Sequence, residues 1–285
     1  MNTRSVPIEK ERINCLFCNR SESDEWASEN GYTAVKCRGC GLVYVNPRPA
    51  STLIDEAVKT GVHRDVEHGR DVIGARSPSK VARYKKLLVG LFPDVLKKQR
   101  PISWIDVGAG FGELVEGVTA LSADGSRVVG LEPMTPKAAV AKARGLDVRE
   151  SYLSEITETF DFLSLINVFS HIPDFREFLR DVKRVLNANG EILIETGNTA
   201  DLKSRSEVPG DLDLPDHLVF AGVNHLRGFL EEAGFQVIAV KEARVDGVLR
   251  FSKNLVKKLM GRKNITVRIP YTSPYRSVFL RARLR

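Results

Sequence analysis

The chain has 285 residues, a formal net charge of +7 at pH 7 and 42% hydrophobic residues. This length allows one large and one small domain, and the composition is ordinary for a globular protein, so the fold does not need disulfides. The sequence contains neither an apolar run of roughly 18 residues, as a membrane-spanning helix requires, nor an N-terminal signal peptide. We therefore expect a cytoplasmic protein, whose paired cysteines bind metal.

The positive charge is concentrated near the C-terminus. Residues 250–285 contain eleven Lys and Arg and no Asp or Glu, which leaves about −4 (7 − 11) for the rest of the chain. Such a segment faces nucleic acid, an anionic membrane surface, a phosphorylated substrate or only solvent. Within it, residues 248–263 are predicted to form a basic amphipathic helix, which packs on the domain, covers an acceptor site or lies on a membrane surface.

Four cysteines follow a short leader. Cys15, Cys18, Cys37 and Cys40 form a C-x2-C-x18-C-x2-C pattern. Two such turns supply four thiolates, which is the tetrahedral set that a structural zinc ion prefers. Because protein groups would fill every coordination position, the site is expected to be structural rather than catalytic. Residues 1–49 are therefore predicted to be a leader and a zinc-binding module.

Residues 50–100 are polar and are predicted to be a mostly helical linker or lid. From residue 101 onward, strands and helices alternate. This alternation predicts a doubly wound, mostly parallel, seven-stranded α/β sheet of Rossmann type in a domain over residues 101–285. The strands are expected at 102–108, 126–133, 147–151, 160–169, 191–197, 235–243 and 277–285. The helices are expected from about 111, at 136–145, at 175–186 before the stop signal NANG, and at 224–235.

A glycine-rich turn joins the first of these strands to its helix. After Asp106, Gly108 permits the tight turn, Gly110 allows a ligand to approach the backbone, and Gly112 allows the helix to pack on the strand. Glu132 ends the next strand, 20 residues (132 − 112) past the last glycine. At that place in a doubly wound sheet, a carboxylate accepts hydrogen bonds from ribose hydroxyls.

On these residues the sequence resembles the class I methyltransferases that depend on S-adenosylmethionine (SAM), over roughly residues 80–245. The D-x-G-x-G-x-G spacing favours SAM over a dinucleotide. The resemblance implies that SAM lies over Asp106, Gly108, Gly110 and Gly112 with its ribose on Glu132, and that Asn167 and Val168 line its pocket. The run CxxCGLVYVNPRP resembles zinc-bearing N-termini of bacterial methyltransferases of sugar and surface-glycan pathways, which points to polysaccharide biosynthesis.

Methyl transfer to an oxygen requires removal of its proton, and histidine is the usual base near neutral pH. His171 follows the fourth strand and His217 follows the fifth, so both lie at the carboxyl edge of the sheet, where ligands bind. We predict that these two act as base or substrate contacts, with a loop or capping role as the alternative. His63 is expected to do little, and His225 to be structural. Glu195 is a weaker candidate, expected to be solvated at a strand end.

The sequence thus predicts a SAM-dependent O-methyltransferase acting on a sugar, nucleotide-sugar, glycolipid or similar small polar metabolite. A sugar C-methyltransferase is one alternative. Another is an RNA methyltransferase that binds RNA through the cysteine module and the basic segment, but that module is not especially basic and lacks interleaved aromatics. A third is a SAM-binding or zinc scaffold without activity. The sequence does not specify the acceptor, the methylated atom or the oligomeric state.

Overall fold

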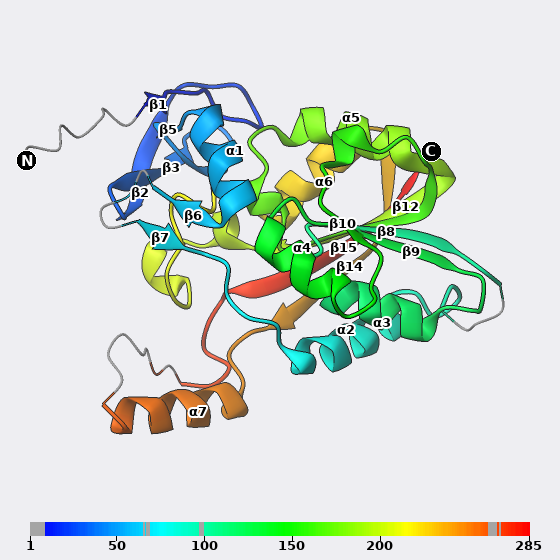
Figure 1. The fold of residues 1–285 in the computed structure, drawn as a ribbon. Helices are drawn as coiled ribbons and strands as arrows, with labels where there is room; N and C mark the ends of the chain where they lie inside the picture. Colours follow the sequence, from blue (N-terminus) through cyan, green and yellow to red (C-terminus); the bar gives the residue numbers. More distant parts are fainter. Residues whose placement is uncertain (1–8, 65, 67–68, 97–99, 262–266, 268) are drawn as a thin grey trace, which may run out of the picture.

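A seven-stranded sheet forms the centre of the molecule, with helices on both faces (Figure 1). The computed structural model describes residues 9–285 except 65, 67–68, 97–99, 262–266 and 268. The strand order is β10-β9-β8-β11-β12-β15-β14. The strands are β8 (Ser103–Val107), β9 (Arg127–Leu131), β10 (Val148–Arg149), β11 (Phe160–Ile166), β12 (Leu186–Gly197), β14 (Phe235–Arg244) and β15 (Arg276–Leu284).

The predicted Rossmann-like α/β class is confirmed, although the sheet is not purely parallel. The contacts from β10 to β12 are parallel, whereas β15 pairs antiparallel with both β12 and β14. Helices cover both faces of the central strands, which explains why β11 is apolar at almost every position rather than alternating. The carboxyl ends of the parallel strands therefore meet at one edge.

Two groups of helices cover the sheet. Apolar side chains of α2 and α3 pack with Trp104 on one face, and those of α5 and α6 pack with Ile192 and Ile194 on the other. Helix α5 ends at Val185 and the chain enters β12 directly, so the predicted stop signal NANG lies inside the strand, where the register with β11 shifts. The helices are α2 (Pro78–Leu91), α3 (Glu113–Leu121), α4 (Thr135–Lys142), α5 (Phe175–Val185) and α6 (Val223–Glu232).

Short 3-10 helices occur in the connections between these elements. They are η1 (Leu153–Glu155), η2 (Phe169–His171), η3 (Thr199–Asp201) and η4 (Arg205–Glu207). Of these, η2 follows β11 and η3 follows β12, so both lie at the carboxyl edge of the sheet.

The cysteine module forms a second, four-stranded sheet of order β13-β4-β3-β2. Its strand β13 comes from the segment after β12 and pairs with β4 (Val219↔Tyr44). The predicted module of residues 1–49 therefore shares its sheet with the predicted methyltransferase domain. These strands are β2 (Ser23–Glu29), β3 (Tyr32–Cys37), β4 (Val43–Val45) and β13 (Val219–Phe220), while β1 (Lys10–Glu11) pairs with β5 (Arg48–Pro49).

The segment that follows is only partly helical. It consists of α1 (Ser51–Thr60), a hairpin of β6 (Val62–His63) and β7 (Arg70–Asp71), and then α2. The hairpin replaces part of the predicted helical linker, because Gly61 ends α1 in the left-handed conformation.

Helix α7 (Val248–Leu259) confirms the predicted helix near the C-terminus, and Figure 1 shows it set apart from the central sheet. Its apolar residues are largely exposed: 55% for Val256, 78% for Leu259 and, at the cap, 72% for Met260. The side chains of Leu249, Lys253, Lys257 and Arg262 lie outside the described residues. Within the described part of the chain, no helix has the length and apolar character that suit a membrane span.

Candidate active site

Two cavities lie at the carboxyl edge of the sheet. The turn cavity, of about 280 Å³, is lined by the glycine-rich turn and by the ends of β9 and β11. The loop cavity, of about 430 Å³, is lined by the end of β12, the start of β15 and the loop before β13. Asn167 lines both cavities, so the two are adjacent.

The glycine-rich turn forms one wall of the turn cavity. Gly108 and Gly110 have φ values of 69° and 57°, which L side chains rarely adopt. A Cβ atom at Gly108 would also lie 2.4 Å from Cγ2 of Val168 across the turn. Gly112 does not line the cavity; a Cβ there would lie 2.5 Å from Leu146, in keeping with the packing role predicted for it.

Glu132 is fixed at the end of β9 in the same wall. Its Oε2 accepts a hydrogen bond from the Gly110 N–H (2.6 Å), and its Oε1 accepts one from the Met134 N–H (3.0 Å). Burial raises the pKa of Glu132, and these two backbone bonds oppose the rise. Each carboxylate oxygen retains a lone pair, so the predicted role of accepting hydrogen bonds from ribose hydroxyls is compatible with this arrangement.

Asp106 lies beneath the turn and is almost fully buried. Ser164 on the neighbouring strand donates from Oγ to Asp106 Oδ1 (2.6 Å) and accepts a bond from the Trp104 indole (2.9 Å). Burial raises the pKa of Asp106 to about 7, although the Ser164 bond opposes it. A cationic ligand in the turn cavity would therefore favour the ionised form of Asp106.

Asn167 and Val168 follow β11 and line the turn cavity. Asn167 adopts a left-handed conformation (φ 58°), and its N–H donates to the Glu195 carbonyl (3.0 Å). The chain then enters η2, which ends at His171.

The two predicted histidines meet between the cavities. His171 lines the turn cavity and His217 lines the loop cavity, and their ring centroids are 4.7 Å apart. The Nδ1 atoms lie 2.8 Å from the carbonyl oxygens of Asp216 and Leu212, respectively. Because a carbonyl only accepts, each Nδ1 donates, and Nε2 is the basic nitrogen of each neutral ring.

The surroundings push the pKa values of these histidines apart. Burial lowers the pKa of His171, but the nearby Asp216 carboxylate outweighs burial and gives a net rise. Burial and the charge of His171 lower the pKa of His217. The bonds from His171 and His63 overcome burial and hold the pKa of Asp216 well below its usual range. His217 is thus the neutral member at neutral pH, which is the state that a general base requires.

The sequence analysis missed His63, which was expected to do little. It is 5% exposed, and its Nε2 lies 3.1 Å from Asp216 Oδ1. On the partner strand of the same hairpin, Arg70 pairs with Asp213. The sequence carries no local signal of this contact, because 153 positions separate His63 from Asp216.

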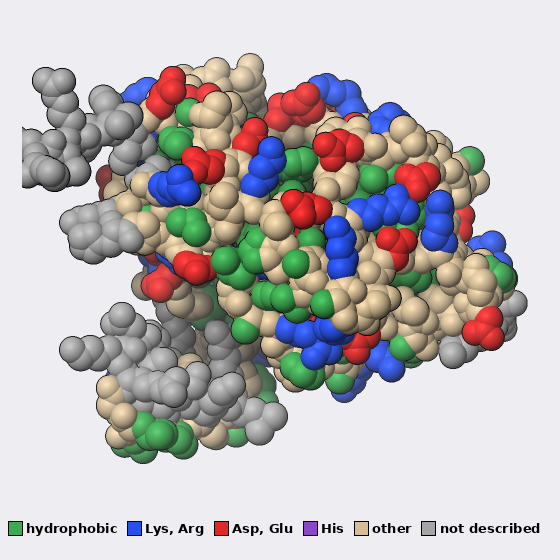
Figure 2. Space-filling view, in the orientation of Figure 1, with side chains coloured by type: hydrophobic (Ala, Val, Ile, Leu, Met, Phe, Trp, Pro, Cys, Tyr) green, Lys and Arg blue, Asp and Glu red, His purple; other side chains and the backbone are tan. Residues whose placement is uncertain are grey.

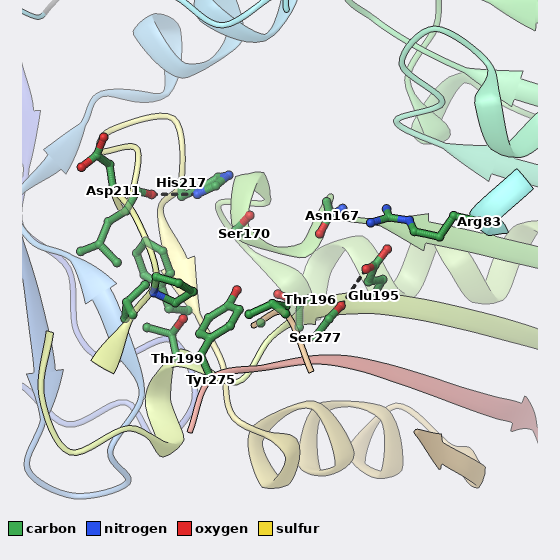
Figure 3. A pocket seen from close by; sticks show the side chains of 16 residues that line it. Arg83, Asn167, Ser170, Glu195, Thr196, Thr199, Asp211, His217, Tyr275 and Ser277 are labelled. Atoms are coloured by element: carbon green, nitrogen blue, oxygen red, sulfur yellow. Dashed lines mark hydrogen bonds between the residues drawn. The ribbon is translucent and has the colours of Figure 1, made fainter. Parts of the chain in front are cut away.

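Glu195 also differs from the expectation of a solvated strand-end acid. It is 4% exposed, and its Oε1 accepts a hydrogen bond from Ser277 Oγ (2.7 Å). Figure 3 shows Glu195 on the wall of the loop cavity, near Asn167 and Arg83. Burial raises the pKa of Glu195, and the Ser277 bond opposes the rise.

The four cysteines form one cluster outside these cavities. Their Sγ atoms all lie within 4.8 Å of one another. Burial opposes ionisation of Cys37, but hydrogen bonds from the Cys40 and Gly39 N–H groups lower its pKa to about 7. Four thiols at this mutual spacing fit a tetrahedral ion with metal–sulfur bonds of about 2.3 Å.

His225 connects this cluster to the large sheet, as its predicted structural role requires. It lies near the start of α6, and its Nε2 is 3.0 Å from the Cys40 carbonyl. Phe17, from the first cysteine turn, makes edge-to-face contacts with His225 and Phe229 at 5.0 Å.

The doubly wound sheet, the glycine-rich turn and the carboxylate after β9 define an α/β protein that binds a nucleoside-type cofactor at its carboxyl edge. Residues 79–240, more than half of the chain, match the family model described as a methyltransferase domain, and the chain belongs to this family. The chain therefore contains a methyltransferase domain of the SAM-dependent class.

Curated relatives match part of the chain. The ubiquinone biosynthesis O-methyltransferase of Azorhizobium caulinodans is 27% identical over 136 residues, which are 44% of this chain and 53% of that protein. The C-methyltransferase NovU of Streptomyces niveus is 28% identical over 131 residues, 43% of this chain and 31% of that protein. The chain thus spans about half and about a third of these two relatives.

Solved structures share the fold at low sequence identity. Coclaurine N-methyltransferase, bound to N-methylheliamine and SAH, has a TM-score of 0.50 at 15% identity, covering 71% of this chain and 72% of its own. The [4+2]-cyclase SpnF also has a TM-score of 0.50, at 18% identity, with coverages of 71% and 80%. This likeness establishes the fold and does not identify the acceptor.

Proposed function

We propose that this methyltransferase transfers the methyl group of SAM to an oxygen of a sugar, nucleotide-sugar, glycolipid or similar small polar metabolite. The observation that carries the proposal is the position of His217. It lies on the loop cavity, beside His171 on the turn cavity, and its lowered pKa keeps it neutral at neutral pH.

In this proposal, SAM occupies the turn cavity, where it supplies an electrophilic methyl group on a sulfonium. The backbone at Gly108 and Gly110 would hold it closely, Glu132 would accept its ribose hydroxyls, and Asn167 and Val168 would line its pocket. Gly112 would act indirectly, by packing the helix against the sheet.

His217 Nε2 would then remove the proton of the acceptor hydroxyl, while the acceptor oxygen bonds to the methyl carbon and the carbon–sulfur bond breaks. His217 ends this step protonated, with S-adenosylhomocysteine as the second product. His171, held by Asp216, would orient the His217 ring and keep its pKa low. Proximity and orientation supply most of the rate, because the sulfonium is already a good leaving group.

The loop cavity supports a polar acceptor. Its lining combines hydroxyl, amide and carboxylate groups with the rings of Phe220 and Tyr275. A polyhydroxylated ring uses both kinds of contact, with hydrogen bonds at its edge and an aromatic surface against its face. The polar lining residues include Asn167, Ser170, Glu195, Thr196, Thr199, Asp211 and Ser277.

A sugar C-methyltransferase is the second candidate, because one relative is named a C-methyltransferase. The same base would remove a proton from a carbon next to a carbonyl group. RNA remains a less favoured acceptor.

We also propose that the four cysteines hold a structural zinc ion. The mutual spacing of their Sγ atoms supports it, because it suits four thiolate ligands around one ion. Reduced thiols are consistent with the cytoplasmic location that we propose.

We further propose that α7 contacts an anionic membrane surface. Its exposed apolar residues would enter the interface, and the basic segment after residue 250 supplies complementary charge. Figure 2 shows hydrophobic side chains gathered on α7, at the lower left. This contact would suit a lipid-linked acceptor.

The test uses SAM labelled in its methyl group, the purified protein and a cell extract with or without ribonuclease. Label in small molecules or lipids, insensitive to ribonuclease, is expected. Loss of label from large molecules on ribonuclease treatment would favour RNA. Unchanged turnover in a variant with both His171→Gln and His217→Gln would contradict the catalytic assignment.

A further inference from the structure

The loop cavity contains a buried acid that the proposed proton transfer does not use. Glu195 Oε1 accepts the Ser277 hydrogen bond, but Oε2 has no hydrogen-bond partner within the described part of the chain. Buried polar atoms in folded proteins nearly always have a partner, so this oxygen requires an explanation.

The position of Glu195 is fixed on both sides. Its strand β12 pairs with β11 at Ile166 and with β15 at Phe279. Its carbonyl accepts the Asn167 N–H, and the Ser277 bond orients its carboxyl group. The side chain therefore cannot turn toward solvent without breaking a short hydrogen bond.

No hydrogen bond joins a cation to this oxygen among the described residues, although Arg83 and Lys80 lie close enough to lower the pKa of Glu195 through space. Figure 3 shows Arg83 and Glu195 at the same end of the cavity, and the dashed line from Glu195 runs to Ser277 and not to Arg83. A hydrogen-bond donor bound in the loop cavity, which Glu195 lines, would supply the missing partner.

We propose that Glu195 Oε2 forms a binding subsite of the loop cavity, which accepts a hydrogen bond from an acceptor group other than the one that receives the methyl. The ligand group is a hydroxyl or an ammonium, as sugars and amino sugars carry. This inference rests on the proposed function in assigning the loop cavity to the acceptor. Glu195 would select for acceptors with a second donor, because an acceptor without one leaves the carboxylate unpaired.

The first experiment needs no ligand. Urea denaturation of the full chain and of Glu195→Gln is compared at pH 5 and pH 8. Gln keeps an acceptor for Ser277 but carries no charge. Because the pKa of Glu195 is raised, the folded state holds its proton more tightly, and ionisation lowers stability as the pH rises. The variant should therefore match or exceed the wild-type midpoint at pH 8, with a smaller advantage at pH 5. A marked loss of stability at pH 8 would instead assign Glu195 a structural role and overturn the proposal.

The second experiment measures binding to the protein loaded with S-adenosylhomocysteine. The probes are glucose and glucosamine, and ligand-observed NMR measures their binding. Comparison of the two sugars distinguishes a hydroxyl donor from an ammonium donor. Glu195→Gln is expected to weaken binding about tenfold to a hundredfold, the loss of one charge-assisted hydrogen bond. The affinity for SAM should not change. Glu242→Gln is the matched control, because it removes the same charge from an exposed side chain that lines neither cavity.

The outcomes separate this inference from the proposed function. Equal sugar binding by Glu195→Gln and wild type would overturn the subsite even if methyl transfer to a sugar is observed. Weaker binding with a retained stability supports it. If neither sugar binds the wild type, both the subsite and the sugar class of the proposed function are contradicted, whatever the stability result.

Discussion

His217 and His171 show how two identical side chains acquire different protonation states. Asp216 lies beside both, but its carboxylate contacts His171 and His63 and leaves His217 to the Leu212 carbonyl. Charge therefore accumulates on His171, and the His217 ring remains neutral and basic. The difference in protonation state between His171 and His217 therefore follows from the position of one carboxylate, Asp216, among three histidines.

The His217→Gln substitution tests the base directly. Loss of a positioned general base lowers kcat by about 10²- to 10⁴-fold. The Kd for SAM should remain unchanged, since His217 does not line the turn cavity. Thr199→Ser, in the same cavity, is the control and should retain activity. A His217→Gln variant with full kcat would exclude this residue as the base.

The Asp216→Asn substitution should act on stability in a defined pH window. Asp216 has a lowered pKa and His171 a raised one, so their interaction is fully present between about pH 4 and about pH 6.5, the unfolded pKa values of the two groups, and declines as the pH rises through the raised pKa of His171. It is lost below that window as Asp216 protonates, and above it as His171 loses its proton. The variant should be less stable by about 1–3 kcal/mol at pH 5.5 and closer to wild type at pH 9, by urea denaturation. An equal loss at both pH values would indicate a role independent of charge.

The residues that could be predicted from the sequence share one property, which is that their partners are close in the chain. The turn from Asp106 to Gly112 and the carboxylate of Glu132 belong to one strand–helix–strand unit. The burial of Glu195 depends on β15, which pairs with it from more than 80 positions away. No periodicity or motif encodes such a contact.

At the scale of elements, the sequence predicted the positions of the seven strands along the chain, because each helix and strand has its own hydrophobic period; it did not predict their order in the sheet. It did not predict the β6–β7 hairpin, since two-residue strands are too short to show a period. It also gave no sign that β13 would join β4. That pairing is stabilised by apolar contacts between the cysteine module and the loop after β12, among them Val43, Leu212 and Phe220.

Helix α7 makes a prediction at this scale. Vesicles containing anionic lipid should bind the full chain. A variant with Leu255→Ser, Val256→Ser and Leu259→Ser should bind these vesicles at least about tenfold more weakly, because apolar burial at the interface is lost. Val140→Ser, which changes an exposed apolar residue of α4, is the control. Equal sedimentation of both variants with vesicles, or wild-type binding to neutral vesicles alone, would contradict the proposal.

At the scale of the whole molecule, the cysteine cluster and the loop cavity are coupled through the shared four-stranded sheet. Removal of the proposed zinc by a chelator, or a Cys37→Ser variant, should lower stability by at least about 3 kcal/mol. Amide exchange should rise first in β3, β4 and β13, and the loop cavity should lose acceptor affinity before the turn cavity loses SAM. Metal analysis of the purified chain tests whether zinc is bound. A metal-free protein as stable as the metal-loaded one would contradict the proposed structural zinc site.

The β4–β13 pairing also constrains how this enzyme can be re-engineered or can diverge. If residues 1–49 were grafted onto another family member without the β13 segment, their sheet would have three strands, and the edge of β4 that pairs with β13 would be unpaired. Conversely, a loop exchanged to alter acceptor choice must still present a strand in register with Val43 and Tyr44. On the proposed function, a change of acceptor loop and a change of N-terminal module would therefore have to occur together, although 175 positions (219 − 44) separate the paired residues Val219 and Tyr44.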